Sequence, residues 1–172
     1  MDNQQERPLA IDISWLAGLW EADGSFCLHK NMLNQRGVRY QIVPQISLTN
    51  TDPILIMEAK KVLNRLQVGY YEIWRQQDGL GTKLKCDIRL TGMKRVKKFL
   101  DYMLPYIRGM KKQRVELILQ FCNLRLSQDK LTRYGDREWE IINQFIELKE
   151  SSTTNTLNKQ PSYTKFLHHE VV

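Results

Sequence analysis

The chain has 172 residues, with 26 Lys or Arg against 19 Asp or Glu and a formal net charge of +7. Its 42% of apolar residues suffice for a core, and its length suits one domain at roughly 100–200 residues per domain. No apolar run approaches the ~20 residues that span a bilayer, and the polar N-terminus is unlike a signal peptide. The three cysteines lack metal-ligand spacing, which argues against a disulfide framework or a Cys-based zinc site. We therefore expect an intracellular protein, cytoplasmic or organellar, without a membrane partner.

Helical and strand periodicities alternate along the chain. In chain order they predict a helix at 13–22 with Asp12 as its N-cap, strands at 25–31 and 39–48, a helix from 53 to 69, strands at 70–76 and 83–90, a helix ending at 105, and helices at 112–126 and 136–149. This αββαββα order with extra C-terminal helices predicts an α+β fold, in which helices cover one face of an antiparallel sheet. Residues 1–10 are then an N-terminal extension, 11–149 a single domain, and 150–172 a flexible tail.

Positive charge is concentrated in one part of the chain. Between Arg75 and Arg114, twelve basic residues stand against three acidic ones. Such a field suits a polyanion, with nucleic acid as the first expectation.

Alternation within the strands predicts which side chains lie on the uncovered face of the sheet. In the third strand, Tyr71 and Ile73 are assigned to the core and Trp74 to the uncovered face. That face mixes Arg, Lys and Gln with Asp and Asn, a set that can read base edges as well as phosphates. The candidate DNA-binding residues are His29, Asn31, Arg39, Gln41, Gln45, Ser47, Trp74, Lys85, Asp87 and Arg89.

The first helix carries a stripe of small residues. Ser14, Gly18 and Ala22 lie four residues apart and therefore share one helix face. Small residues at this spacing let two helices approach closely. The stripe could pack against the sheet of its own chain, or it could form a dimer interface with a second copy.

Two acidic residues, Glu21 and Asp23, stand at the end of the same helix, where a carboxylate is electrostatically disfavoured. This placement suggests that a cation is bound there, and carboxylate and carbonyl oxygens are ligands that Mg²⁺ prefers. If two such helices pack around a twofold axis, both copies of Asp23 lie beside the axis.

The run 16–24, LAGLWEADG, resembles the signature of the LAGLIDADG homing endonucleases. The αββαββα order over about residues 11–145 is also similar to that family's domain. Only one signature copy is present, and in the family this implies a homodimer. The resemblance implies that Asp23 is the metal-binding acid essential for cleavage and that the Ala22 carbonyl helps to hold the metal. The implied cofactor is Mg²⁺ or another divalent cation such as Mn²⁺ or Ca²⁺.

The resemblance extends to two further catalytic positions. Asn50 is similar to the polar residue that orients water in the family's active site. The segment 105–113 resembles the stretch that carries a catalytic lysine, for which Lys111 is favoured and Lys112 is the alternative.

Together these features predict a site-specific, intron-encoded endonuclease that hydrolyses double-stranded DNA as a homodimer. A ten-residue strand at roughly 3.3 Å per residue matches about ten base pairs, so two copies would read a pseudo-palindromic target of roughly 20 base pairs. The alternatives are an RNA-binding maturase, with intron RNA as its partner, or a catalytically silent DNA-binding regulator on the same scaffold.

Overall fold

The computed structural model describes residues 6–32, 40–76, 84–128 and 133–153. Its elements are α1 (Glu6–Asp23), β1 (Gly24–Met32), β2 (Tyr40–Asn50), α2 (Pro53–Arg65), β3 (Tyr71–Gln76), β4 (Leu84–Thr91), α3 (Met93–Met103), α4 (Gly109–Leu126) and α5 (Asp136–Thr153). The predicted α+β fold and element order are confirmed. Helix α1 begins before the predicted domain start at residue 11, and α5 continues past the predicted domain end at residue 149.

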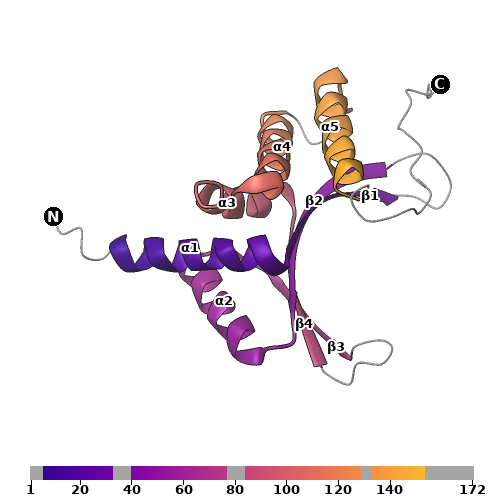
Figure 1. Ribbon diagram of the computed structural model, residues 1–172. Coiled ribbons are helices and arrows are strands. Elements are labelled where there is room, and N and C mark those ends of the chain that lie inside the picture. Colours follow the sequence, from indigo (N-terminus) through magenta and orange to yellow (C-terminus); the bar gives the residue numbers. More distant parts are fainter. Residues whose placement is uncertain (1–5, 33–39, 77–83, 129–132, 154–172) are drawn as a thin grey trace.

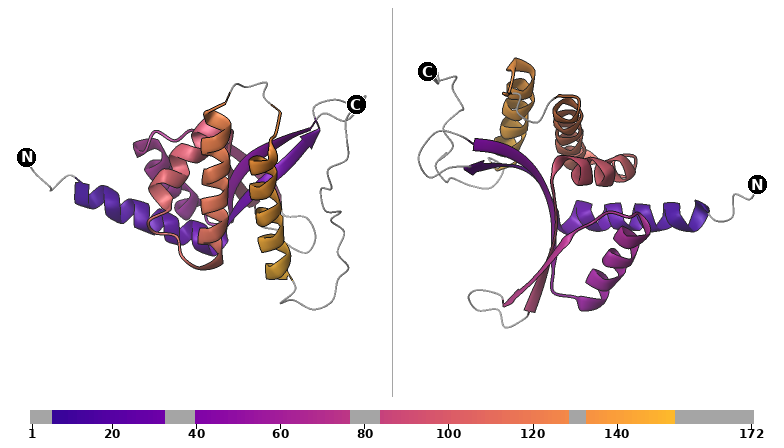
Figure 2. Two further views of the ribbon diagram at one scale, coloured as in Figure 1. Left: turned by 90° about the horizontal axis from the view of Figure 1, so that it is seen from above. Right: turned by 180° about the vertical axis from the view of Figure 1, so that it is seen from behind.

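The four strands form one antiparallel sheet in the order β1-β2-β4-β3. The sheet is curved, and all five helices lie on its convex side (Figures 1 and 2). No described helix covers the concave face. No helix among the described residues has the length and apolar character needed to cross a membrane.

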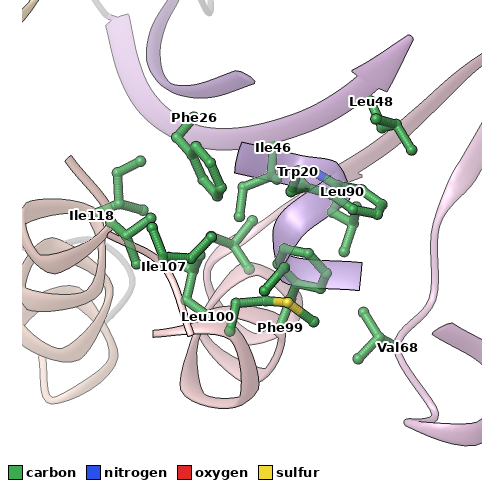
Figure 3. Close-up of a cluster of buried hydrophobic side chains, with 14 of the residues drawn as sticks. Trp20, Phe26, Ile46, Leu48, Val68, Leu90, Phe99, Leu100, Ile107 and Ile118 are labelled. Atoms are coloured by element: carbon green, nitrogen blue, oxygen red, sulfur yellow. The ribbon is translucent and has the colours of Figure 1, made fainter. Parts of the chain in front are cut away.

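The core lies between the sheet and the helices and fixes the end of α1 against the middle of the sheet. Trp20 is fully buried, and its ring centroid lies 5.0 Å from that of Phe99 in α3. Ile46 and Leu90, from the central strands, are buried in the same cluster (Figure 3). Burying one such side chain contributes about 1.5–3 kcal/mol, so this cluster holds the residues that follow Trp20 in a defined place.

Two predicted helix ends differ from those observed, one because of a contact with another helix and one because of the local backbone. Asp12 is not an N-cap; it lies inside α1, where it pairs with Arg65 of α2. Helix α2 ends at Arg65 and not at Gly69, because Gln67 adopts a positive φ of 53° that leaves the helix. Its start is as predicted, since the Asp52 side chain accepts hydrogen bonds from Ile54 N at 2.9 Å and Leu55 N at 3.3 Å.

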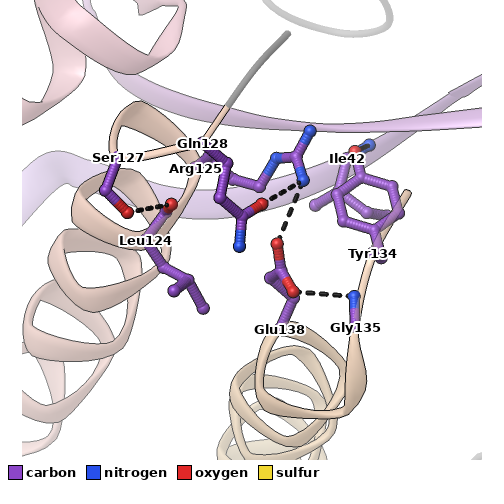
Figure 4. Close-up of polar contacts among 8 residues, drawn as sticks. All are labelled: Ile42, Leu124, Arg125, Ser127, Gln128, Tyr134, Gly135 and Glu138. Atoms are coloured by element: carbon purple, nitrogen blue, oxygen red, sulfur yellow. Dashed lines mark hydrogen bonds and ion pairs between the residues drawn. The ribbon is translucent and has the colours of Figure 1, made fainter. Parts of the chain in front are cut away.

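Tyr134, just before α5, contacts a free edge of the sheet (Figure 4). Pairing of β2 with β4 begins only at Gln45, so β4 does not reach Ile42. The Ile42 N–H donates to the Tyr134 hydroxyl at 2.8 Å. Arg125 lies over the Tyr134 ring at 4.8 Å and pairs with the buried Glu138 at 3.0 Å. An exposed strand edge can pair with other chains, and the Tyr134 hydroxyl occupies the Ile42 N–H of this one.

Replacing Tyr134 with Phe is expected to lower the free energy of unfolding by about 1–2 kcal/mol, because the Ile42 N–H then loses its acceptor. Urea unfolding would measure the loss. Tyr102→Phe, at a more exposed tyrosine in α3, is the control and should change stability by less than about 0.5 kcal/mol. Equal stability of the two variants would contradict this role of Tyr134.

Candidate active site

The C-terminal end of α1 brings two of the predicted site residues together. Asp23 is the last residue of α1 and is exposed. Asn50, at the end of β2, donates from Nδ2 to Asp23 Oδ2 at 3.0 Å. The Asn50 Oδ1 atom accepts from the Asp52 N–H at 2.8 Å. Asn50 therefore orients the Asp23 carboxylate and also supports the start of α2.

Lys111, in the first turn of α4, reaches the same place, whereas Lys112 is exposed and makes no such contact. The structure thus brings Lys111, and not Lys112, to the end of α1; the sequence favoured Lys111 but left Lys112 as the alternative. The Lys111 ammonium donates to four backbone carbonyls at the end of α1 and the start of β1: those of Glu21, Gly24 at 3.0 Å, Trp20 at 3.3 Å and Ala22 at 3.4 Å.

The surroundings of Lys111 change its titration. Burial lowers the pKa of the Lys111 ammonium below its ordinary value, and the neighbouring Arg114 adds to this effect. The carboxylates of Glu21 and Asp23 act in the opposite direction. The ammonium therefore lies in a partly dehydrated position, where a positive charge acts more strongly than in open water.

The donors at this end of α1 fit a hard divalent cation. The Asp23 carboxylate and the Ala22 carbonyl are oxygen donors of the kind that Mg²⁺ binds. Among the residues that the structure describes, no three His, Cys, Asp or Glu side chains gather at one point.

The stripe of small residues on α1 lies on an open surface. Ser14, Gly18 and Ala22 are all exposed, and a Cβ atom added at Gly18 would meet no atom within 4 Å. The interpretation that the stripe packs against its own sheet is wrong. Ile11 and Trp15 of the same helix are 67% and 40% exposed, and α1 projects beyond the other helices (Figures 1 and 2). This combination leaves a low-bulk, partly apolar helix face available to another chain.

Most of the predicted DNA-binding residues share the concave face of the sheet. Strand pairing sets Asn31 opposite Gln41 and Ser47 opposite Arg89, so these side chains point the same way. Arg39 lies outside the described residues. By the same register and alternation, the concave face also carries His29, Gln45 and Lys85.

The face prediction for β3 is wrong, and with it the placement of Trp74. Trp74 lies opposite the buried Cys86, and its Nε1 donates to Glu72, which pairs at 2.5 Å with Lys60 of α2. Trp74 thus lies on the helix side. Ile73 lies opposite Asp87 on the concave side and is 40% exposed. The error arises because β3 is an edge strand, with all six residues exposed, so apolar side chains there do not mark the core.

Asp87 lies on the predicted face of the sheet, but its carboxylate is buried and contacts other side chains of the sheet. Its side chain is 1% exposed, and Oδ1 accepts from the Thr49 hydroxyl at 2.5 Å. Its Oδ2 accepts from Arg89 Nη2 at 2.9 Å and pairs with Arg75. Both carboxylate oxygens are therefore occupied, so Asp87 orients two arginines and does not itself present an acceptor to a base. Sequence reasoning missed Thr49 and Arg75, whose only signal is their closeness to Asp87 in the strand register.

Comparisons with known proteins agree with this architecture. Residues 10–103, more than half of the chain, match the model of the LAGLIDADG-like domain. The chain therefore belongs to the LAGLIDADG family. Comparison with curated proteins gives no match.

Solved homing endonucleases share the fold at low sequence identity. I-CvuI, in complex with the I-CreI target in the presence of Mg, is 17% identical, with a TM-score of 0.58 over 90% of this chain and 88% of that one. The archaeal intron-encoded I-Vdi141I, complexed with DNA, is 14% identical, with a TM-score of 0.56 over 90% and 89% of the two chains. I-TnaI is 14% identical, with a TM-score of 0.57 over 83% and 96%.

Proposed function

We propose that the protein is a homodimeric, site-specific endonuclease that hydrolyses double-stranded DNA with a divalent cation. The observation that carries this proposal is the exposed stripe of α1, which ends one residue before the exposed Asp23. If two α1 helices pack along the stripe, each copy adds an acidic group beside a common axis. Membership of the LAGLIDADG family and a curved sheet, one face of which no described helix covers, support the same activity.

The proposed division of roles follows from the contacts at the end of α1. Asp23 and the Ala22 carbonyl of both copies would hold Mg²⁺, which supplies charge neutralisation at the phosphoryl oxygens and an activated water. Asn50 holds the Asp23 carboxylate in one orientation and can order water beside it. Lys111 adds a positive charge in a partly dehydrated position, where it can stabilise negative charge that develops on the phosphate.

The dimensions of the sheet support a long target. Strand β2 has eleven residues, which at about 3.3 Å each corresponds to about ten base pairs of duplex. Two copies related by a twofold axis would read roughly 20 base pairs of pseudo-palindromic sequence in the major groove. The candidate base-reading and phosphate-contacting residues are His29, Asn31, Arg39, Gln41, Gln45, Ser47, Lys85 and Arg89.

The maturase alternative has less support. The solved relatives I-CvuI and I-Vdi141I are bound to DNA, and nothing in the described residues favours intron RNA over a duplex. The exposed Asp23, which a binding protein would not need, favours the enzyme over a silent regulator.

The experiment that tests the proposal is a cleavage selection. A library of randomised duplexes is incubated with the purified protein in Mg²⁺ or in EDTA. We expect double-strand breaks at one pseudo-palindromic sequence in Mg²⁺ and intact, bound DNA in EDTA. Tight binding of RNA without cleavage of any duplex would overturn the proposal in favour of the maturase.

Asp87→Asn is expected to reduce sequence discrimination without reducing affinity for DNA. The variant loses the charge that orients Arg75 and Arg89, and one well-placed arginine–guanine pair contributes about 1–3 kcal/mol of discrimination. Competition binding with single-base variants of the selected target should therefore show about a fivefold or greater loss of discrimination at one or two positions. The control Asp101→Asn changes net charge equally, at an exposed ion pair of α3, and should keep full discrimination.

A further inference from the structure

The C-terminal end of α1 lies against the N-terminal end of α4, and a charged side chain from each helix contacts the backbone at the end of the other. The Glu21 carboxylate of α1 accepts a hydrogen bond from the Arg108 N–H, immediately before α4, at 3.0 Å. In the other direction, Lys111 of α4 donates to the last carbonyls of α1, among them that of Ala22.

Each of these charges is unfavourably placed on its own helix. The carboxyl end of a helix carries a partial negative charge and the amino end a partial positive charge. Glu21 lies near the negative end of α1, and Lys111 lies near the positive end of α4. The Glu21 carboxylate instead contacts the positive end of α4, and the Lys111 ammonium contacts the negative end of α1. Each charge is therefore stabilised by the end of the other helix.

The sequence of α4 explains why it needs an acid from another element. In a capping box, the residue at position N3 is Glu or Gln and reaches back to the backbone N–H of the N-cap residue. In α4 the N-cap is Arg108, whose own side chain makes no capping bond, and position N3 is Lys111. The Arg108 N–H therefore receives its acceptor from Glu21, and Lys111 remains available for the end of α1.

We propose that Glu21 is a positioning residue for the cleavage reaction, because it fixes the first turn of α4 and so holds Lys111 against the end of α1. The inference rests on the proposed endonuclease function, and it adds a residue that touches neither the DNA nor the cation. Glu21 acts through the Arg108 backbone and Lys111. Its essential property is a side-chain oxygen that is long enough to accept from the Arg108 N–H.

Two variants of matched length separate the hydrogen bond from the charge. Glu21→Gln keeps an amide oxygen that can accept from the Arg108 N–H, whereas Glu21→Met keeps the length and removes the acceptor; both are good helix formers. At saturating DNA and Mg²⁺, we expect the single-turnover cleavage rate to fall about 10–100-fold in Glu21→Met and to be largely retained in Glu21→Gln. The Kd for the target and the dimer mass should be unchanged in both. A merely structural defect would lower binding and cleavage together.

Amide hydrogen exchange gives a readout that does not need cleavage. Glu21→Met should speed exchange at the start of α4 about tenfold or more, and Glu21→Gln should not. Asp12→Ala, which removes an ion-paired acid elsewhere on α1, is the control and should leave this segment unchanged. Wild-type exchange and cleavage in Glu21→Met, or equal cleavage losses in both variants, would overturn the proposal. If the wild-type protein cleaves no duplex, the proposed function fails, while exchange still decides whether Glu21 fixes α4.

Discussion

Replacing Asp23 with Asn is expected to abolish DNA cleavage while DNA binding is retained. Asp23 is the only carboxylate that we assign to the cation, and the substitution removes its charge but keeps its shape and its ability to bond to Asn50. A divalent cation contributes several kcal/mol of charge stabilisation in the transition state, and a loss of about 4 kcal/mol corresponds to about 1,000-fold in rate. The rate of single-turnover cleavage of the selected target would measure this loss.

The control for this variant is Asp52→Asn, close by at the start of α2. The Asp52 side chain caps α2, and its backbone N–H, which the substitution keeps, donates to Asn50, so this variant should lose some stability but keep most of its cleavage rate. If Asp23→Asn cleaves at a rate within tenfold of the wild type, Asp23 is not the carboxylate that binds the cation.

Gly18→Leu is expected to affect folding and assembly in opposite directions. In one chain a side chain at Gly18 meets open space, and leucine is favoured over glycine inside a helix by about 1 kcal/mol, so the monomer should be as stable or slightly more stable. In the proposed dimer the same side chain lies between two helices that must approach closely. Sedimentation equilibrium should therefore show monomers, and cleavage should be lost.

Gly18→Ala provides a graded comparison, because a single methyl group is smaller than the leucine side chain. It should weaken the dimer less and keep measurable cleavage. A Gly18→Leu protein that remains dimeric and active would show that the stripe is not the interface.

The features that could be predicted from the sequence are those encoded locally. Alternation and helical spacing gave the element order, and the Asp52-Pro53 pair marked the start of α2. Asp12 also looked like a local cap, but its partner is Arg65 on another helix, which no local pattern reveals. Strand β3 was misassigned because exposure at a sheet edge depends on which helices cover it.

The candidate site also combines residues that local sequence indicates with contacts that depend on the fold. The signature placed Asp23 and the small-residue stripe directly, since both lie within one helix. The choice between Lys111 and Lys112 depends on where α4 begins relative to α1, which only the fold supplies. The burial of Asp87 and the contact of Glu21 with the Arg108 backbone each join residues from different elements, so composition alone could not indicate them.

A cysteine placed at Ala22 tests most directly whether two α1 helices meet beside Asp23. In a Cys27→Ser background the two remaining cysteines are buried, and burial raises the pKa of the Cys86 thiol and raises that of Cys122 to about 12, so neither should react readily. A disulfide requires Cα atoms about 4.4–6.8 Å apart, so mild oxidation of Ala22→Cys should give a covalent dimer if the helices pack as proposed. Gln144→Cys, exposed on α5, should form no covalent dimer. An Ala22→Cys protein that also forms no covalent dimer under oxidation would contradict the paired-helix centre.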